Sequence, residues 1–176
     1  MSNYRRLFVE NASYFFTVAL ADRRQTLLTD HITGLRRAYQ RVLRQHPFET
    51  VAICVLPDHM HAIWTLPEGD TDYPLRWRLI KQYFSHALHL EMPRSASKIK
   101  HREKGIWQRR YWEHVIRSQE EMEKCIDYIH YNPVKHGWVS RCADWEYSSF
   151  HRYVLEGILS PDWGIDVEYE FGNENP

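Results

Sequence analysis

Apolar residues recur along the chain with two periods, one typical of strands and one typical of helices. Runs rich in aromatic and β-branched residues predict strands over 14–20, 49–56, 59–66 and within 107–117. Helical spacing of apolar positions predicts helices over 32–45, 75–88 and 118–132. The order β-α-β-β-α-β-α predicts an α+β fold, a ferredoxin-like antiparallel sheet with helices packed on one side, plus a C-terminal tail.

Proline and loop residues predict where several of these elements end. The dipeptide at 57–58 separates the two middle strands and predicts a hairpin. Pro133 restricts the backbone of the residue before it, so regular helix is expected to end there. Tyr128 and Asn132 then belong to the last helical turn. The polar and basic residues 93–104 are expected to form a loop.

The length of 176 residues and a hydrophobic content of 43% indicate one domain with its own core. We expect that domain to span residues 1–157, with residues 158–176 as an acidic tail. No segment approaches the roughly 18 apolar residues that a membrane span requires, and the N-terminus lacks the apolar stretch of a signal peptide. A cytoplasmic protein without a membrane partner is therefore expected. The three cysteines show no spacing typical of a disulfide framework or a cysteine zinc site.

The formal net charge of zero conceals an asymmetry between the two parts of the chain. Residues 1–117 carry 19 Lys and Arg against 11 Asp and Glu, whereas residues 118–176 carry 4 against 12. Local groups of basic residues in the first part favour a polyanionic partner such as nucleic acid. Aromatic residues make up 14% of the chain, enough for core packing and for stacking on unpaired bases.

Candidate chemistry begins with the pair His59 and His61 in a predicted strand. Residues two apart point to the same face of a strand, so both imidazoles can bind one ion while Met60 faces the other side. The alternative to a metal site is a structural role, in which the two histidines are hydrogen-bonded at the end of a strand. An imidazole pair with one neutral oxygen or amide ligand leaves positions open for phosphate oxygens, which suits Mg²⁺ or Mn²⁺.

The second part of the predicted site lies in the helix that ends near Pro133. Tyr128 is a candidate nucleophile for a phosphodiester, and Asn132, one turn later on the same helix face, is a candidate third metal ligand. His130 and Tyr131 compete for these two roles, and spacing alone does not separate them.

Five motifs, in order and with sensible gaps, resemble those of the REP-associated tyrosine transposases, which are relatives of the IS200-like, HUH-type transposases with a single catalytic tyrosine. They are LPDHMH at 56–61, LPEGD at 66–70, WQRRYWEH at 107–114, YIHYNPVKHG at 128–137 and SSFH at 148–151. The resemblance extends from the first strand to about Trp163, and five separate motifs make it far more specific than the histidine pair.

This resemblance implies a metal-dependent single-stranded DNA endonuclease and strand transferase. Its substrates would be palindromic repeat hairpins, and its intermediate a covalent 5′-phosphotyrosine. By position, His59 and His61 match the metal-binding pair and Tyr128 matches the nucleophile. Asn132 stands where relatives place a polar ligand, often glutamine, and is shorter by one methylene. Mg²⁺ or Mn²⁺ is the implied cofactor, residues 1–157 form the catalytic domain, and the acting unit is a monomer or a homodimer.

Basic residues along the chain are candidates to contact the DNA backbone. They are Arg5, Arg6, Arg76, Arg78, Lys81, Arg109 and Arg110. Four aromatic residues, Trp77, Trp107, Tyr111 and Trp112, are candidates to stack on unpaired bases.

Three other functions compete with this interpretation. A hairpin-binding protein without catalysis would not need the two histidines and Tyr128 together. A hydrolase that activates water would form no covalent adduct with DNA. An RNA-binding module of ferredoxin-like fold would need exposed aromatic residues on the sheet face, where the histidines are predicted instead.

Overall fold

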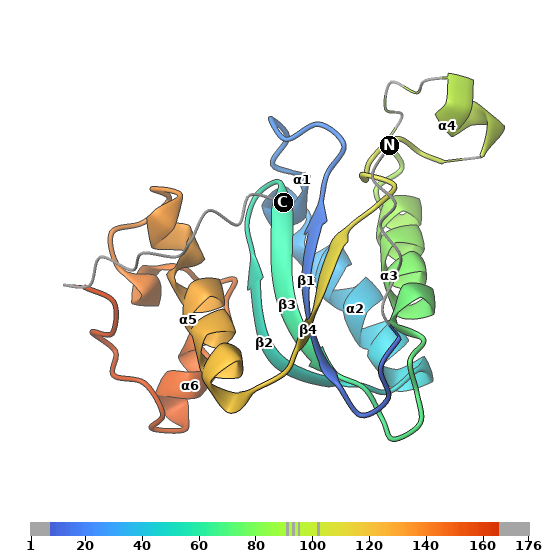
Figure 1. Ribbon diagram of the computed structural model, residues 1–176. Coiled ribbons are helices and arrows are strands. Elements are labelled where there is room, and N and C mark those ends of the chain that lie inside the picture. The colour runs from blue at the N-terminus through green and yellow to red at the C-terminus, as the bar shows by residue number, and fades with distance from the viewer. Residues whose placement is uncertain (1–7, 91, 93, 95, 102, 166–176) are drawn as a thin grey trace.

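A four-stranded antiparallel sheet lies at the centre of the protein in a computed structural model that describes residues 8–90, 92, 94, 96–101 and 103–165 (Figure 1). Its strands are β1 (Ser13–Ala19), β2 (Glu49–Val55), β3 (His59–Thr65) and β4 (Trp112–Ile116). The strand order is β2-β3-β1-β4, and every neighbouring pair is antiparallel. The α+β fold with an antiparallel sheet is therefore confirmed.

The helices pack on both faces of this sheet (Figure 1). They are α1 (Leu27–Asp30), α2 (Ile32–Gln45), α3 (Tyr73–Ala87), α4 (Ala96–Lys100), α5 (Gln119–Lys135), the 3-10 helix η1 (Cys142–Asp144) and α6 (Phe150–Leu155). α2 and α3 pack together on one side, while α5 contacts β2 and β3 on the other. The short helix α4 lies within the segment that the sequence predicted as loop.

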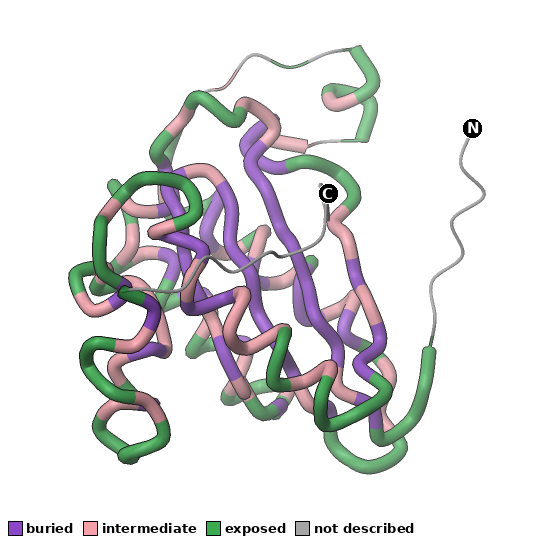
Figure 2. The backbone as a smooth tube through the Cα atoms, turned by 60° about the vertical axis from the view of Figure 1, so that its left-hand side comes forward, coloured by how far each residue is buried: buried purple, intermediate pink, exposed green. Residues whose placement is uncertain are grey.

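The expectation of helices on one side holds for α2 and α3 but is corrected for α5. The central strands β1 and β3 are buried along most of their length (Figure 2), and each contributes apolar side chains to both faces. Phe16 and Trp64 join the core beneath α2 and α3, whereas Phe15 and Ile63 join a second core with Ile129 of α5. Because apolar surface on either face must be removed from water, both faces need a helical cover.

The hairpin between β2 and β3 fixes the position of the histidine pair. The Leu56 backbone N–H donates to the His59 carbonyl oxygen at 2.8 Å across the turn. In the register of β1 with β3, Thr17 lies opposite His61. His59 and His61 therefore alternate with Met60, which packs in the core on the α2 and α3 side. Both imidazoles belong to the face that α5 partly covers.

α5 continues through Pro133 to Lys135, which corrects the predicted end of this helix. A proline near a helix end removes only one backbone hydrogen bond, and the next turn still closes because the His136 N–H donates to the Asn132 carbonyl oxygen at 3.0 Å. The helix ends at Lys135, and Gly137, just beyond the C-cap residue His136, has a φ of 70° that favours glycine. The extra residues bring Lys135 and His136 to the face that carries Tyr128.

The described part of the C-terminal segment folds back onto α5 and α6. The Trp163 ring packs against Phe150, with ring centroids 6.1 Å apart, and Asp162 accepts a hydrogen bond from Arg141 at 2.9 Å. Residues 166–176, which hold most of the predicted acidic tail, lie outside the described residues. In the part of the chain that the structure describes, no helix has the length and hydropathy of a membrane span.

Candidate active site

His59 is held in one orientation by a carboxylate. Its Nδ1 lies 2.7 Å from Oδ1 of Asp58, and the guanidinium of Arg23 forms an ion pair with the same carboxylate. Burial raises the pKa of Asp58, but the hydrogen bonds with His59 and Arg23, together with the charges of these two residues, outweigh it and hold this pKa at about 2. An ionised Asp58 accepts the Nδ1 proton, so the lone pair of His59 lies on Nε2.

His61 is buried and keeps one nitrogen without a partner. Its Nδ1 lies 2.9 Å from the hydroxyl of Thr17, while Nε2 has no hydrogen-bond partner among the described residues. Burial, followed by the charge of His59, lowers the pKa of His61 well below its usual value. The imidazole is therefore neutral near pH 7, as a metal ligand must be.

α5 places Tyr128 against the histidine pair. The ring centroids of Tyr128 and His61 are 5.3 Å apart, and those of His59 and His61 are 4.9 Å apart. Tyr128 also contacts Phe15 of β1 at a centroid distance of 5.9 Å. The half-buried phenol is thus fixed by packing on two sides, within one chain.

Two further residues of this site, Lys135 and His136, were missed by the sequence interpretation. Lys135 places Nζ 4.7 Å from the Tyr128 ring centroid, and the His136 ring lies 5.3 Å from that of His59. Their signal was present in the sequence, because Lys135 follows Tyr128 by two helical turns. The assumed helix end at Pro133 concealed it.

Asn132 lies on α5, one helical turn after Tyr128 and one turn before His136. The Tyr128 ring faces His61, and the His136 ring faces His59. Its side chain is fully buried, and neither Oδ1 nor Nδ2 has a hydrogen-bond partner among the described residues. An unpartnered buried amide costs roughly 1–3 kcal/mol. Buried atoms of this kind, here on Asn132 and on His61 at Nε2, indicate a ligand that the described residues do not supply.

These donors fit a divalent cation held by two imidazoles and one amide oxygen. Across the described residues, no three His, Cys, Asp or Glu side chains converge closely enough to bind a metal. A metal held by the histidine pair would take its other ligands from different groups, and the Asn132 amide oxygen has suitable chemistry.

The rival residues His130 and Tyr131 lie elsewhere around α5. His130 Nε2 is 2.9 Å from Ser149 Oγ, and burial lowers the pKa of His130 to about 3. Tyr131 lies against Gly164, where a Cβ atom would come within 3.3 Å of its ring. The structure therefore brings Tyr128 to the histidine pair, and neither rival shares that contact in the described interactions.

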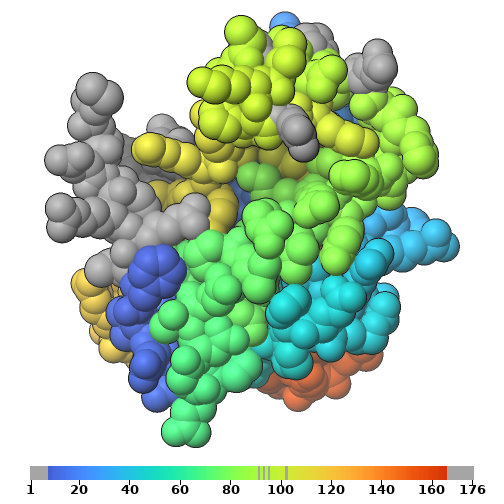
Figure 3. All heavy atoms as spheres, turned by 90° about the vertical axis from the view of Figure 1, so that its right-hand side faces the viewer, coloured from blue at the N-terminus to red at the C-terminus, as the bar shows by residue number. Residues whose placement is uncertain are grey.

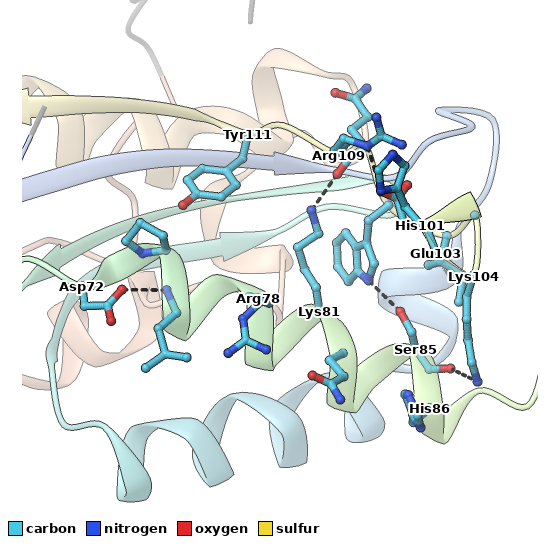
Figure 4. A pocket seen from close by; sticks show the side chains of 17 residues that line it. Asp72, Arg78, Lys81, Ser85, His86, His101, Glu103, Lys104, Arg109 and Tyr111 are labelled. Carbon is cyan, nitrogen blue, oxygen red and sulfur yellow. Dashed lines mark hydrogen bonds and ion pairs between the residues drawn. The ribbon is translucent and has the colours of Figure 1, made fainter. Parts of the chain in front are cut away.

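A groove of about 830 Å³ lies between α3 and the segment 101–111 (Figures 3 and 4). Arg78, Lys81 and Arg109, three of the candidates for contact with the DNA backbone, line it. Lys81 donates from Nζ to the Gln108 carbonyl oxygen at 2.6 Å, and Arg109 pairs with Glu103 at 2.8 Å. We call this surface the α3 groove.

Arg76 does not belong to that surface, and its assignment to DNA binding is corrected. Its side chain is 3% exposed, and every N–H direction of the guanidinium is used. The acceptors are the carboxylate of Asp70 and the carbonyl oxygens of His46, Pro47 and Asp72. Two residues along an α-helix correspond to a rotation of about 200° around its axis, so residues 76 and 78 point in nearly opposite directions. Of the two, only Arg78 faces solvent.

The remaining DNA-binding candidates fall into different environments. Arg110 is exposed two residues before β4, whereas Arg5 and Arg6 lie outside the described residues. Among the stacking candidates, Trp77 is buried against Trp64 at 4.1 Å, and Trp107 is buried with its indole N–H donating to Ser85. Those two residues belong to the core, because burial of their large rings removes much apolar surface from water. Tyr111 and Trp112 remain half-buried.

Comparison with known proteins adds to this geometry. Residues 8–132 match the family described as IS200-like transposases. The chain is 48% identical to the REP-associated tyrosine transposase of Escherichia coli K12 over 95% of this chain and 93% of that protein. A Haemophilus influenzae relative assigned to the same class is 50% identical over 93% and 94% of the two chains.

A solved structure of a REP-associated tyrosine transposase bound to a REP hairpin superimposes with a TM-score of 0.86 and 46% identity. The match covers 100% of this chain and 99% of that chain. Because the family pattern covers most of the sequence and the relatives extend over nearly all of it, the chain belongs to the IS200-like transposase family.

Proposed function

We propose that this chain is a metal-dependent single-stranded DNA endonuclease and strand transferase that acts on REP-type palindromic hairpins. Tyr128 is the nucleophile, and His59, His61 and Asn132 hold Mg²⁺ or Mn²⁺. The observation that carries the proposal is the convergence of Tyr128 with His61, at 5.3 Å between ring centroids, where the buried Nε2 of His61 has no partner among the described residues. A relative of this chain bound to a REP hairpin supports the choice of substrate.

The reaction follows from attack of the Tyr128 phenol oxygen on a phosphodiester. The new bond joins that oxygen to phosphorus, the bond from phosphorus to the 3′ oxygen breaks, and the phenol proton is lost while the leaving oxygen gains one. The products are a 5′-phosphotyrosine and a free 3′-hydroxyl. A second 3′-hydroxyl can reverse the step on another strand, so no nucleotide cofactor is required.

Protein groups around Tyr128 prepare this step. Phe15 and His61 fix the ring, and the Lys135 ammonium, 4.7 Å from the ring centroid, adds positive charge where phosphate approaches. Asp58 orients His59. A divalent metal bound to the histidines and Asn132 would polarise the scissile phosphate.

The acting unit is proposed to be a monomer. The nucleophile and both histidines meet within one chain, which supports a site that a second copy need not complete. Residues 1–157 are proposed as the catalytic domain, with 158–176 as an appended segment. Arg78, Lys81, Arg109 and Arg110, together with Arg5 and Arg6, are proposed to contact the DNA backbone.

The proposal is tested with a labelled REP hairpin that carries single-stranded flanks. We expect a covalent protein–DNA adduct on a denaturing gel with Mg²⁺ or Mn²⁺, and none with EDTA. Cleavage without an adduct would favour a hydrolase that activates water. A shift on a native gel without cleavage would leave a hairpin-binding protein.

Arg76 and Arg78 form a matched pair that separates folding from DNA binding. Arg76→Gln should lower the free energy of unfolding by about 3 kcal/mol, because buried acceptors lose their partner. Hairpin affinity of the folded fraction should stay unchanged. Arg78→Gln should leave stability unchanged and reduce the slope of log affinity against log salt by about 1. Denaturant unfolding and salt titrations measure both, and a reversed pattern would exclude these assignments.

A further inference from the structure

A second, smaller hollow lies between the α3 groove and the histidine pair. It encloses about 250 Å³ and is lined by Thr17, Ala19, Arg23, Gln108, Arg110, Tyr111 and Trp112. We call it the Arg110 hollow. Gln108 and Tyr111 also line the α3 groove, so the two cavities adjoin.

At its other end, the Arg110 hollow reaches the candidate metal ligands. The hydroxyl of Thr17 lies 2.9 Å from Nδ1 of His61, and Arg23 contacts both Asp58 and His59. The hollow therefore lies between a large basic groove and the residues that contact His59 and His61.

The lining of the hollow has the chemistry that binds an unpaired nucleotide. Arg110 is exposed and makes no ion pair with any described residue, and the Arg23 side chain is 42% exposed. The Trp112 ring is half-buried, because α5 packs chiefly over β2 and β3 and leaves this part of β4 less covered. Two guanidinium groups beside aromatic rings combine phosphate binding with base stacking.

Size limits what each cavity can hold. The α3 groove, at about 830 Å³, is more than three times as large as the Arg110 hollow, at about 250 Å³. We propose that the Arg110 hollow binds one unpaired nucleotide of the DNA, between the hairpin held in the α3 groove and the scissile phosphate. Its phosphate lies between Arg23 and Arg110, and its base lies against Trp112. This inference rests on the proposed function, since it assigns one position of the same substrate.

The test compares two labelled hairpins, one blunt and one with a short single-stranded extension. Arg110→Gln and Trp112→Leu should each weaken binding of the extended hairpin by about tenfold and leave binding of the blunt hairpin unchanged. Arg37→Gln, an exposed arginine on α2, is the matched control and should change neither affinity. A 2-aminopurine in the extension next to the hairpin should be quenched by the wild-type protein and less so by Trp112→Leu.

The outcomes distinguish this inference from the proposed function. If the wild-type protein forms the covalent adduct but Arg110→Gln binds both hairpins as wild type does, the Arg110 hollow is not a nucleotide subsite. Equal losses for the blunt and extended hairpins would also overturn it, since the hollow would then contact duplex. If the wild-type protein forms no adduct yet the losses are confined to the extended hairpin, the subsite stands and the catalytic proposal fails.

Discussion

Tyr128→Phe is expected to abolish the covalent adduct and DNA cleavage, with a loss of about 10³-fold or more, because no other oxygen replaces the nucleophile. The substitution removes one hydroxyl and keeps the ring contacts with Phe15 and His61. Hairpin affinity and thermal stability should therefore stay close to wild type. Adduct formation on a denaturing gel and hairpin binding in a native gel measure the two properties separately.

Tyr131→Phe is the matched control for this experiment. Tyr131 lies on the same helix, but its ring packs against Gly164 instead of the histidine pair. Its variant should form the adduct as the wild type does. If Tyr131→Phe lost the adduct while Tyr128→Phe kept it, the assignment of the nucleophile would be wrong.

His61→Ala is expected to remove metal-dependent cleavage and to weaken Mn²⁺ binding by at least about 100-fold. Nε2 of His61 is buried without a described partner, so its loss removes a ligand without breaking a hydrogen bond at that atom. Isothermal titration with Mn²⁺ measures the affinity directly. In a thermal scan, Mn²⁺ should raise the Tm of the wild type but not that of the variant, since ligand that binds the folded state stabilises it.

A histidine outside the site tests whether this effect is specific. His31 is exposed between α1 and α2, and His31→Ala should keep both the Mn²⁺ affinity and the rise in Tm. Undiminished Mn²⁺ binding by folded His61→Ala would contradict the assigned ligand set. Loss of folding in this variant would appear as a lower Tm without metal, so the two effects are separable.

Most of the fold could be predicted because each signal depends on neighbouring residues. Strand alternation and helical spacing are local, and the predicted strands overlap β1, β2, β3 and β4. The face occupied by α5 was not predictable in this way. A strand that is apolar on both faces can be covered by helices on one side or on both. Which of these occurs depends on packing between distant segments, such as that of Phe15 and Ile129 in one buried cluster.

The candidate site shows the same division between local and distant information. His59 and His61 share a face because strand side chains alternate, and Tyr128 and Asn132 share one because they are four residues apart. Arg76 was assigned wrongly because its burial depends on carbonyl oxygens near Pro47, 29 residues away in sequence. Arg23 was not assigned to the site because nothing near it in sequence indicates contact with Asp58, 35 residues later.

The sequence by itself determined the strand and helix order, the paired imidazoles, the position of the phenol one turn before an amide, and the family resemblance. All of these follow from residue type and short-range periodicity. Only the tertiary structure decided that α5 passes Pro133 and brings Lys135 and His136 to the site, and that Arg76 is internal. Only the tertiary structure placed the Arg110 hollow next to the histidine pair. These arrangements depend on how residues far apart in the chain pack, and on which polar groups are then able to pair with one another.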